Sequence, residues 1–121
     1  MKTISTLTEL IAELPSYGNR TVLLQLEKED ARQYRYDALC RTGRKLASGL
    51  IQNGIQPGDS VGLFANPGFE WMAACLGTLQ AGALVMPLDL QLTQETLSAI
   101  LRDSDAKAIF STSDQIKRLQ Q

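Results

Sequence analysis

The chain has 121 residues, of which 44% are hydrophobic and 21% are charged, and its formal net charge is −1. These values match one ordinary globular domain, and the mixed, nearly balanced charge creates no field that favours nucleic acid or an anionic membrane as a partner. The chain contains no histidine, which excludes Ser-His-Asp and Cys-His nucleophilic catalysis and removes the commonest metal ligand.

The two cysteines and the first residues bear on the cellular compartment. Cys40 and Cys75 are far apart and form no CxxC motif, so we interpret both as small buried thiols in a reducing cytosol. Residues 1–9 contain Ser, Thr and Glu in place of the apolar segment of a signal peptide. We therefore expect a cytoplasmic protein.

The first half of the chain predicts a helix, a hairpin and a longer helix. Apolar residues at helical spacing indicate a helix over residues 6–14. Residues 21–26 and 32–36 are expected to form an antiparallel hairpin with one wet face, and only this pair looks like a sheet edge. A second helix is expected over residues 37–53. Its predicted apolar stripe comprises Leu39, Gly43, Leu46, Ala47, Leu50 and Ile51.

The segment around which the fold is expected to form is residues 54–89, because Glu70 is the only charge between Asp59 and Asp89. Residues 60–64 predict a short buried strand. A helix should follow and run to about residue 80, with Asn66 as its N-cap and Pro67 at its first position. Residues 83–86 predict the next strand. This βαβ pattern predicts parallel strands.

The same segment does not favour a membrane span. Residues 71–88 are free of charge and long enough to be a transmembrane candidate. Gly77, Gln80, Gly82 and Pro87 interrupt the run, however, and no basic cluster lies close to either end.

The C-terminal part continues the alternation of helix and strand. Thr93 is a suitable N-cap for a helix that reaches about residue 102, and residues 106–110 predict a strand. A final helix should point Ile116 and Leu119 inward. The whole order predicts an α/β fold over residues 1–121: a three-layer sandwich with a mainly parallel sheet and an N-terminal antiparallel hairpin.

The candidate functional residues all have simpler structural explanations. Ligands of open parallel sheets bind beyond the carboxyl ends of the strands, where this sequence places Asn66, Asp89 and residues 111–113. Capping explains Asn66 better than ligand contact, and Asp89 has no second acid nearby in sequence. The basic cluster Arg41, Arg44 and Lys45 is best explained as a solvated helix face. We assign no catalytic, cofactor-binding or metal-binding residue.

The helix over residues 66–80 is apolar on nearly every side. Phe69, Met72, Ala73, Leu76 and Gly77 form one face, and the opposite face, with Trp71, Ala74, Cys75 and Thr78, also lacks charge. A helix of this kind is normally covered on both sides. We therefore expect more protein to pack against it, in cis or as a self-associating copy.

Several motifs together resemble the N-terminal portion of the AMP-forming adenylating enzymes, a superfamily of acyl-CoA and aryl-CoA synthetases, luciferases and peptide-synthetase adenylation domains. The matching segments are Tyr36-Asp37-Ala38-Leu39, Leu46-Ala47-Ser48-Gly49-Leu50, residues 54–63, Asn66-Pro67, residues 76–88 and residues 97–107. The resemblance covers nearly the whole chain in order. One departure is that Arg35 and Ala38 replace the Thr and Glu of the capping box that often begins the long helix.

The resemblance implies a reaction in which a carboxylate attacks ATP to give an acyl-adenylate and pyrophosphate, usually followed by transfer to a thiol. It implies ATP, Mg²⁺ and CoA for the full-length family and fatty acid metabolism as a setting. The family's phosphate loop and catalytic lysine would lie beyond Gln121, so we expect this segment to bind no cofactor and to be inactive alone. Its partner would be the remainder of the ligase.

The sequence is compatible with three hypotheses about the function of this chain. The chain is interpreted first as a segment of an acyl- or aryl-CoA ligase, because a Tyr-Pro-x-Glu-Arg sequence typical of peptide synthetases is missing after Asp89. A self-sufficient α/β binding or interaction module is the second reading. One half of a split adenylating enzyme is the third.

Overall fold

Helices and strands alternate in the predicted order over residues 6–119, the part of the chain that the computed structural model describes. Residues 1–5, in the segment interpreted as unlike a signal peptide, and residues 120–121 lie outside the described part. The elements are α1 (Leu7–Glu13), the 3₁₀ turn η1 (Leu14–Tyr17), β1 (Thr21–Glu27), β2 (Asp30–Arg35), α2 (Tyr36–Gln52), β3 (Ser60–Phe64), α3 (Phe69–Gln80), β4 (Leu84–Pro87), α4 (Gln94–Asp103), β5 (Ala108–Ser111) and α5 (Ser113–Leu119).

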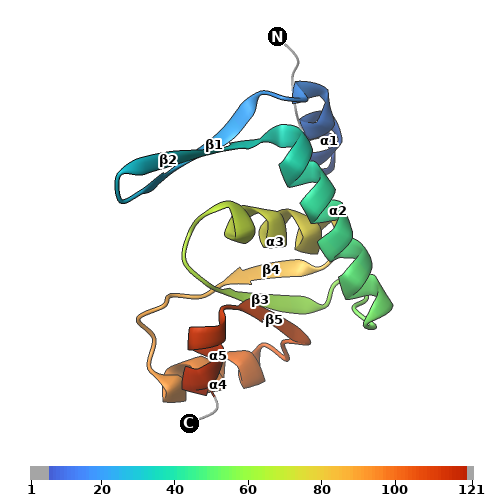
Figure 1. Cartoon of the computed structure of the whole chain (residues 1–121). Helices are drawn as coiled ribbons and strands as arrows, with labels where there is room; N and C mark the ends of the chain where they lie inside the picture. The colour runs from blue at the N-terminus through green and yellow to red at the C-terminus, as the bar shows by residue number, and fades with distance from the viewer. Residues whose placement is uncertain (1–5, 120–121) are drawn as a thin grey trace.

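Three parallel strands in the order β4-β3-β5 form the central layer. Val61 of β3 is the partner of Val85 on one side and of Ala108 on the other. Figure 1 shows α3 and α2 over one face of this sheet and α4 with α5 on the opposite side. The predicted three-layer α/β architecture and the parallel βαβ unit are therefore confirmed.

The antiparallel hairpin is confirmed, but its predicted role as the sheet edge is wrong. β1 and β2 pair from Thr21↔Arg35 to Glu27↔Asp30 and form a separate two-stranded sheet. The ring of Tyr34 in β2 stacks on Phe69 at the start of α3, with centroids 4.3 Å apart and planes 9° apart. Through this contact the hairpin packs against helix α3 instead of lying beside a strand of the parallel sheet. Among residues 6–119, the edge strands of the parallel sheet are β4 and β5.

The start of α3 also differs from the prediction. The N-cap is Gly68 and the helix begins at Phe69, so the predicted N-cap Asn66 and first helical residue Pro67 are wrong. Both residues are exposed and precede the helix. Gly68 has extended backbone (φ 162°, ψ −166°), and a Cβ there would lie only 2.9 Å from Oε1 of Gln25. The amide end of the Gln25 side chain therefore packs directly against this glycine.

The predicted cap of α4 is confirmed, whereas two predicted inward side chains are exposed. Thr93 is the N-cap of α4, and its Oγ1 accepts a hydrogen bond from the Thr96 N–H at 3.2 Å. The inward positions predicted for Ile51 and Ile116 are wrong, because these side chains are 56% and 43% exposed. Ile51 lies beside the buried stripe of α2, not on it, and Ile116 belongs to a short helix with few neighbours. The side chain of Leu119 is outside the described part.

Helices α2 and α3 approach each other at two glycines. A Cβ added to Gly77 would lie 2.8 Å from both the Gly43 carbonyl oxygen and Leu46 Cβ, and 3.2 Å from the Ala47 nitrogen. A Cβ on Gly43 would lie 3.0 Å from Leu76 Cδ2. The backbones are therefore packed more closely than any larger side chain would permit.

This packing changes the interpretation of α3. The sequence predicts that further protein covers the helix face with Ala74 and Thr78, but both residues are already buried within the chain. The Thr78 Oγ1 donates a hydrogen bond to the Ala74 carbonyl at 2.7 Å. Trp71 and Cys75 are half-buried. The apolar run that resembled a membrane span is divided between α3 and β4. Within residues 6–119, no helix combines the length and apolarity that crossing a membrane requires.

Gly77→Ala should lower the free energy of unfolding, and Gly49→Ala should raise it. Alanine favours a helix interior by up to about 1 kcal/mol over glycine, but at Gly77 the new methyl group meets the α2 backbone, and overpacking costs about 1–3 kcal/mol. At Gly49 a Cβ meets nothing within 4 Å. Urea unfolding of both variants measures the difference. An equal gain in both would disprove the close α2–α3 contact.

Candidate functional site

The carboxyl ends of the three parallel strands are the place where a ligand of such a sheet is expected. Two hollows lie at this edge. One, of about 520 Å³, lies beside the segment after β4, and the other, of about 470 Å³, extends to the end of β5. Ala65, Pro67 and Trp71 line both hollows. The half-buried indole therefore lies between them.

The two polar candidates from the sequence lie in different hollows. Asp89 lines the hollow beside β4, and Asn66 lines the one that reaches β5. The Oδ1 atom of Asp89 accepts a hydrogen bond from the Gln91 N–H at 2.9 Å, which forms a local turn before α4. The structure does not bring the two residues together in one site. In the described part of the chain there is no cluster of three or more His, Cys, Asp or Glu that could hold a metal ion.

The hydroxyl groups at the end of β5 take part in local structure. Ser111 Oγ donates to the Phe64 carbonyl at 2.9 Å and so joins the ends of β5 and β3. Thr112 Oγ1 accepts from the Gln115 N–H at 3.3 Å at the start of α5. These contacts explain both residues without a ligand.

Gln25 is a polar residue of this edge that the sequence interpretation missed. It comes from β1, far away in sequence, and lines the hollow that reaches β5. Its Oε1 atom is buried beside Gly68. The available signal was a single amide within the otherwise apolar end of the strand, Val22-Leu23-Leu24-Gln25-Leu26. Nothing in the sequence indicated which element that amide would reach.

The basic cluster of α2 does not belong to this edge. Arg41, Arg44 and Lys45 are exposed, and none of them lines either hollow. This placement confirms the solvated helix face.

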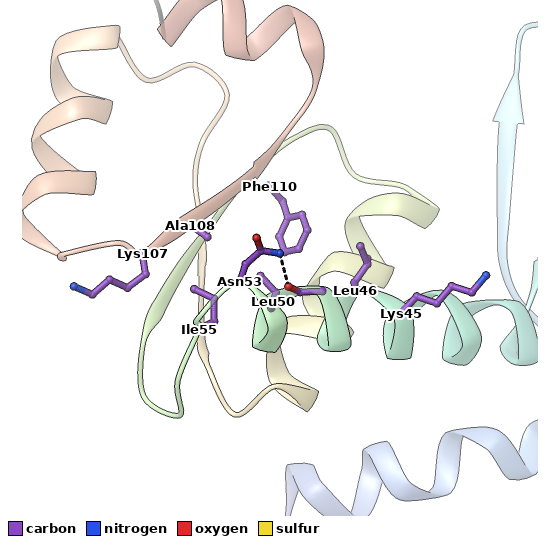
Figure 2. Close-up of a pocket in the computed structure, with 9 residues that line it drawn as sticks. Lys45, Leu46, Leu50, Asn53, Ile55, Lys107, Ala108 and Phe110 are labelled. Atoms are coloured by element: carbon purple, nitrogen blue, oxygen red, sulfur yellow. Dashed lines mark hydrogen bonds between the residues drawn. The ribbon is translucent and has the colours of Figure 1, made fainter.

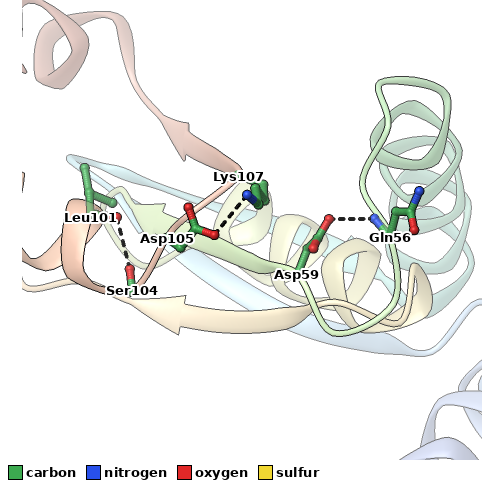
Figure 3. A network of polar contacts seen from close by, with 6 residues as sticks. All are labelled: Gln56, Asp59, Leu101, Ser104, Asp105 and Lys107. Carbon is green, nitrogen blue, oxygen red and sulfur yellow. Dashed lines mark hydrogen bonds and ion pairs between the residues drawn. The ribbon is translucent and has the colours of Figure 1, made fainter.

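The opposite edge of the sheet holds a small set of polar contacts, shown in Figure 3. Lys107 Nζ lies 3.0 Å from Asp105 Oδ2, and Asp59 Oδ2 accepts from the Gln56 N–H at 2.8 Å. The hydrogen bond and charge of Asp105 raise the pKa of Lys107. The two side chains of the ion pair are 47% and 83% exposed, so it is a surface pair of small energetic value.

The cysteines are not arranged as nucleophiles. Cys40 is 4% exposed and Cys75 is half-buried. Burial raises the pKa of both thiols, and at Cys40 the positive charge of Arg44 opposes that effect only in part. A raised pKa leaves less thiolate at neutral pH, and the thiolate is the reactive form.

Ser111→Ala should lower the free energy of unfolding by about 0.5–1.5 kcal/mol, because it removes the hydrogen bond to the Phe64 carbonyl. Ser113→Ala is the matched control, since Ser113 is an exposed residue at the start of α5. Urea unfolding of the two variants tests the assignment. Equal effects would mean that the Ser111 hydroxyl does not stabilise the junction of β3 and β5.

Both thiols should react with a disulfide reagent more slowly than free cysteine near neutral pH, with Cys75 ahead of Cys40. The raised pKa values reduce the thiolate fraction, and burial restricts access most strongly at Cys40. Stopped-flow labelling of Cys40→Ala and Cys75→Ala assigns each rate. In denaturant the two rates should converge. A native rate at Cys40 equal to that of free cysteine would contradict this description.

The chain is similar to known proteins in both sequence and structure. The sequence model of the family described as AMP-binding enzyme matches residues 12–121. Surfactin synthase subunit 2 from Bacillus subtilis (strain 168) is 36% identical over 81 residues, which are 67% of this chain and 2% of that protein. A crotonobetaine/carnitine–CoA ligase from Citrobacter koseri is 30% identical over 99 residues, 81% of this chain and 19% of that enzyme.

The fold is also present in solved structures. A fatty acid AMP ligase from Legionella pneumophila superposes with a TM-score of 0.79 and 25% identity, over 90% of this chain and 20% of that one. The chain thus spans about a fifth or less of the length of these proteins.

Proposed function

Because the chain belongs to the AMP-binding enzyme family, we propose that it is the N-terminal segment of an ATP-dependent, AMP-forming ligase. The parent enzyme would activate a carboxylate as an acyl-adenylate and then form a thioester. The observation that carries this proposal is the family match over residues 12–121, nearly the whole chain. The fold of residues 6–119 and its similarity to a fatty acid AMP ligase support it.

The role of this segment would be structural. Its strand ends present two largely apolar hollows whose charged lining residues are Glu70 and Asp89, with no Lys or Arg among the residues that line them. The Asp89 carboxylate already accepts a backbone hydrogen bond. This lining does not fit the phosphate groups of ATP or CoA, which need basic side chains or phosphate-binding amides. It also does not fit Mg²⁺, which needs several oxygen ligands. Those groups would be bound by the rest of the ligase.

The thiol acceptor is the finer part of the proposal. Relatives of the chain include both a CoA ligase and peptide synthetases. We favour CoA because the sequence after Asp89 is Leu90-Gln91-Leu92-Thr93, without the Tyr-Pro-x-Glu-Arg pattern of peptide synthetases. In the structure this stretch is a turn that ends at the Thr93 cap of α4. We further propose a cytoplasmic location, since the substrates ATP and CoA belong to that compartment.

The isolated chain should show no ATP–pyrophosphate exchange with a broad panel of carboxylates, because the groups that bind ATP would be absent. The polypeptide translated from its complete reading frame in the source cell should show exchange with at least one of them. Mass spectrometry of one gel band for peptides beyond Gln121 identifies that product. Turnover by the pure isolated chain would refute the structural role. A native product that ends near Gln121 would favour a split enzyme or an independent binding module.

A further inference from the structure

A hollow of about 380 Å³ lies between helix α1 and helix α3. Apolar residues line it at helical spacing on both sides. The α1 side comprises Leu7, Leu10, Ile11 and Leu14, and the α3 side comprises Trp71, Met72, Cys75, Leu76 and Leu79. Two apolar stripes with the same spacing therefore border one hollow, as the stripes of two packed helices do.

The contact between these stripes differs at the two ends of α1. Ile11 and Leu14 pack against the buried cluster that contains Leu76. In contrast, Leu7 and Leu10 are 51% and 39% exposed, and α1 contains no buried residue. The end of α1 is thus packed on the core, whereas its first turn leaves apolar side chains in contact with solvent.

The junction between α1 and the 3₁₀ turn η1 has the features of a hinge. Pro15 has no N–H, so the helical hydrogen-bond ladder ends at the Leu14 N–H. Beyond this point the chain is held to the start of α2, because the Asp37 N–H donates to the Gly18 carbonyl at 2.9 Å. Helix α1 can therefore bend at its junction with η1 while η1 stays in place.

The groove between α2 and β5 differs, because both of its walls are fixed. It has a volume of about 410 Å³, and Leu50, Ile55 and Phe110 are among its lining residues. Figure 2 shows the Asn53 side chain directed back to α2, where its amide donates to the Gly49 carbonyl at 2.7 Å. Leu50 and Ile55 are buried, and β5 is paired with β3. Of these two hollows, the one beneath α1 alone has a wall that is held at a single end.

We propose that α1 is a flap that bends at the Leu14–Pro15 junction and closes onto α3. Closure brings Leu7 and Leu10 against Cys75 and the Trp71 ring and removes apolar surface of both helices from water. The flap belongs to the chain itself, so it covers in cis part of the α3 face that the sequence predicts to be covered. The movement involves elements of this chain alone and does not depend on the proposed ligase activity.

The reactivity of Cys75 measures closure, because this thiol lines the hollow that the flap covers. The test uses the full 121-residue chain with Cys40→Ala, so that Cys75 is its one thiol. Leu7→Gln and, separately, Leu10→Gln replace an apolar contact of the closed flap by an amide, which weakens closure without placing a charge near the thiol. Thr8→Gln is the matched control, because Thr8 is an exposed residue of α1 that does not line the hollow.

A disulfide reagent should label Cys75 about threefold faster in Leu7→Gln and in Leu10→Gln than in the parent, because a flap that is closed in about two thirds of the molecules slows labelling by that factor. Acrylamide should also quench the fluorescence of Trp71, the single tryptophan, more strongly in both variants. Thr8→Gln should match the parent in both measurements. Unchanged labelling and quenching in both leucine variants would overturn the flap.

A disulfide trap tests the same movement without the glutamine variants and so decides the question if those variants do not fold. In the Cys40→Ala background, oxidised glutathione should join the new thiol of Leu7→Cys to Cys75 within one chain, because closure brings the two together. The new thiol of Thr8→Cys should stay unjoined. Absence of the first disulfide, or equal yields in the two variants, would overturn the flap.

The same experiments distinguish the flap from self-association. A disulfide that joins two chains, or protection of Cys75 that increases with protein concentration, would show that a second copy covers α3. Either result would overturn the assignment of this surface to α1. Protection that is independent of concentration is expected for a flap within one chain.

Discussion

The close contact of α2 and α3 at Gly43 and Gly77 is the constraint on which the rest of the structure depends. A single methyl group at Gly77 would lie 2.8 Å from the backbone of α2, so the two helices pack side by side as one layer. Helix α3 also contacts β3 and β4, and its Ala73 and Ala74 are buried. Because α3 has α2 on one side and the sheet on another, its nearly uniform apolar composition is largely satisfied within this chain.

The position of α2 in that layer also determines what stays open. α2 packs against α3 and borders β5 only across a groove, so the apolar side chains of Ala108 and Phe110 are half-buried. On the other face, Gly62 admits Leu101 of α4, Ile109 and Leu88 to about 3.3–3.4 Å of where its Cβ would be. The sheet is thus tightly packed at β3 and incompletely covered at β5.

The carboxyl edge of the sheet fits the same description. Ser111, Thr112 and Asp89, the polar side chains at the ends of β5 and β4, join two strands, cap a helix and close a turn. Their hydrogen bonds are directed at the chain's own backbone. Within an AMP-forming ligase, such an edge would hold the framework in shape, and the phosphate and metal chemistry would come from residues outside this segment.

The sequence by itself determined the alternation of helices and strands, the parallel βαβ unit and the cap of α4. These features depend on residues close together in the chain: the period of apolar side chains, the glycines and prolines between elements, and a Thr93 hydroxyl three residues from its partner amide. Only the tertiary structure decided the features that involve distant residues. Helix α3 begins after Gly68 instead of after Asn66, and Gln25, more than forty positions earlier, lies against that glycine. The hairpin forms a separate sheet, and Tyr34 stacks on Phe69 of α3 instead of pairing beside a strand of the parallel sheet. Ile51 is exposed because the buried side of α2 is set by where α3 crosses it, and the groove at β5 exists for the same reason. Local periodicity specifies which residues are apolar, whereas the partner that covers each of them depends on close approach in three dimensions.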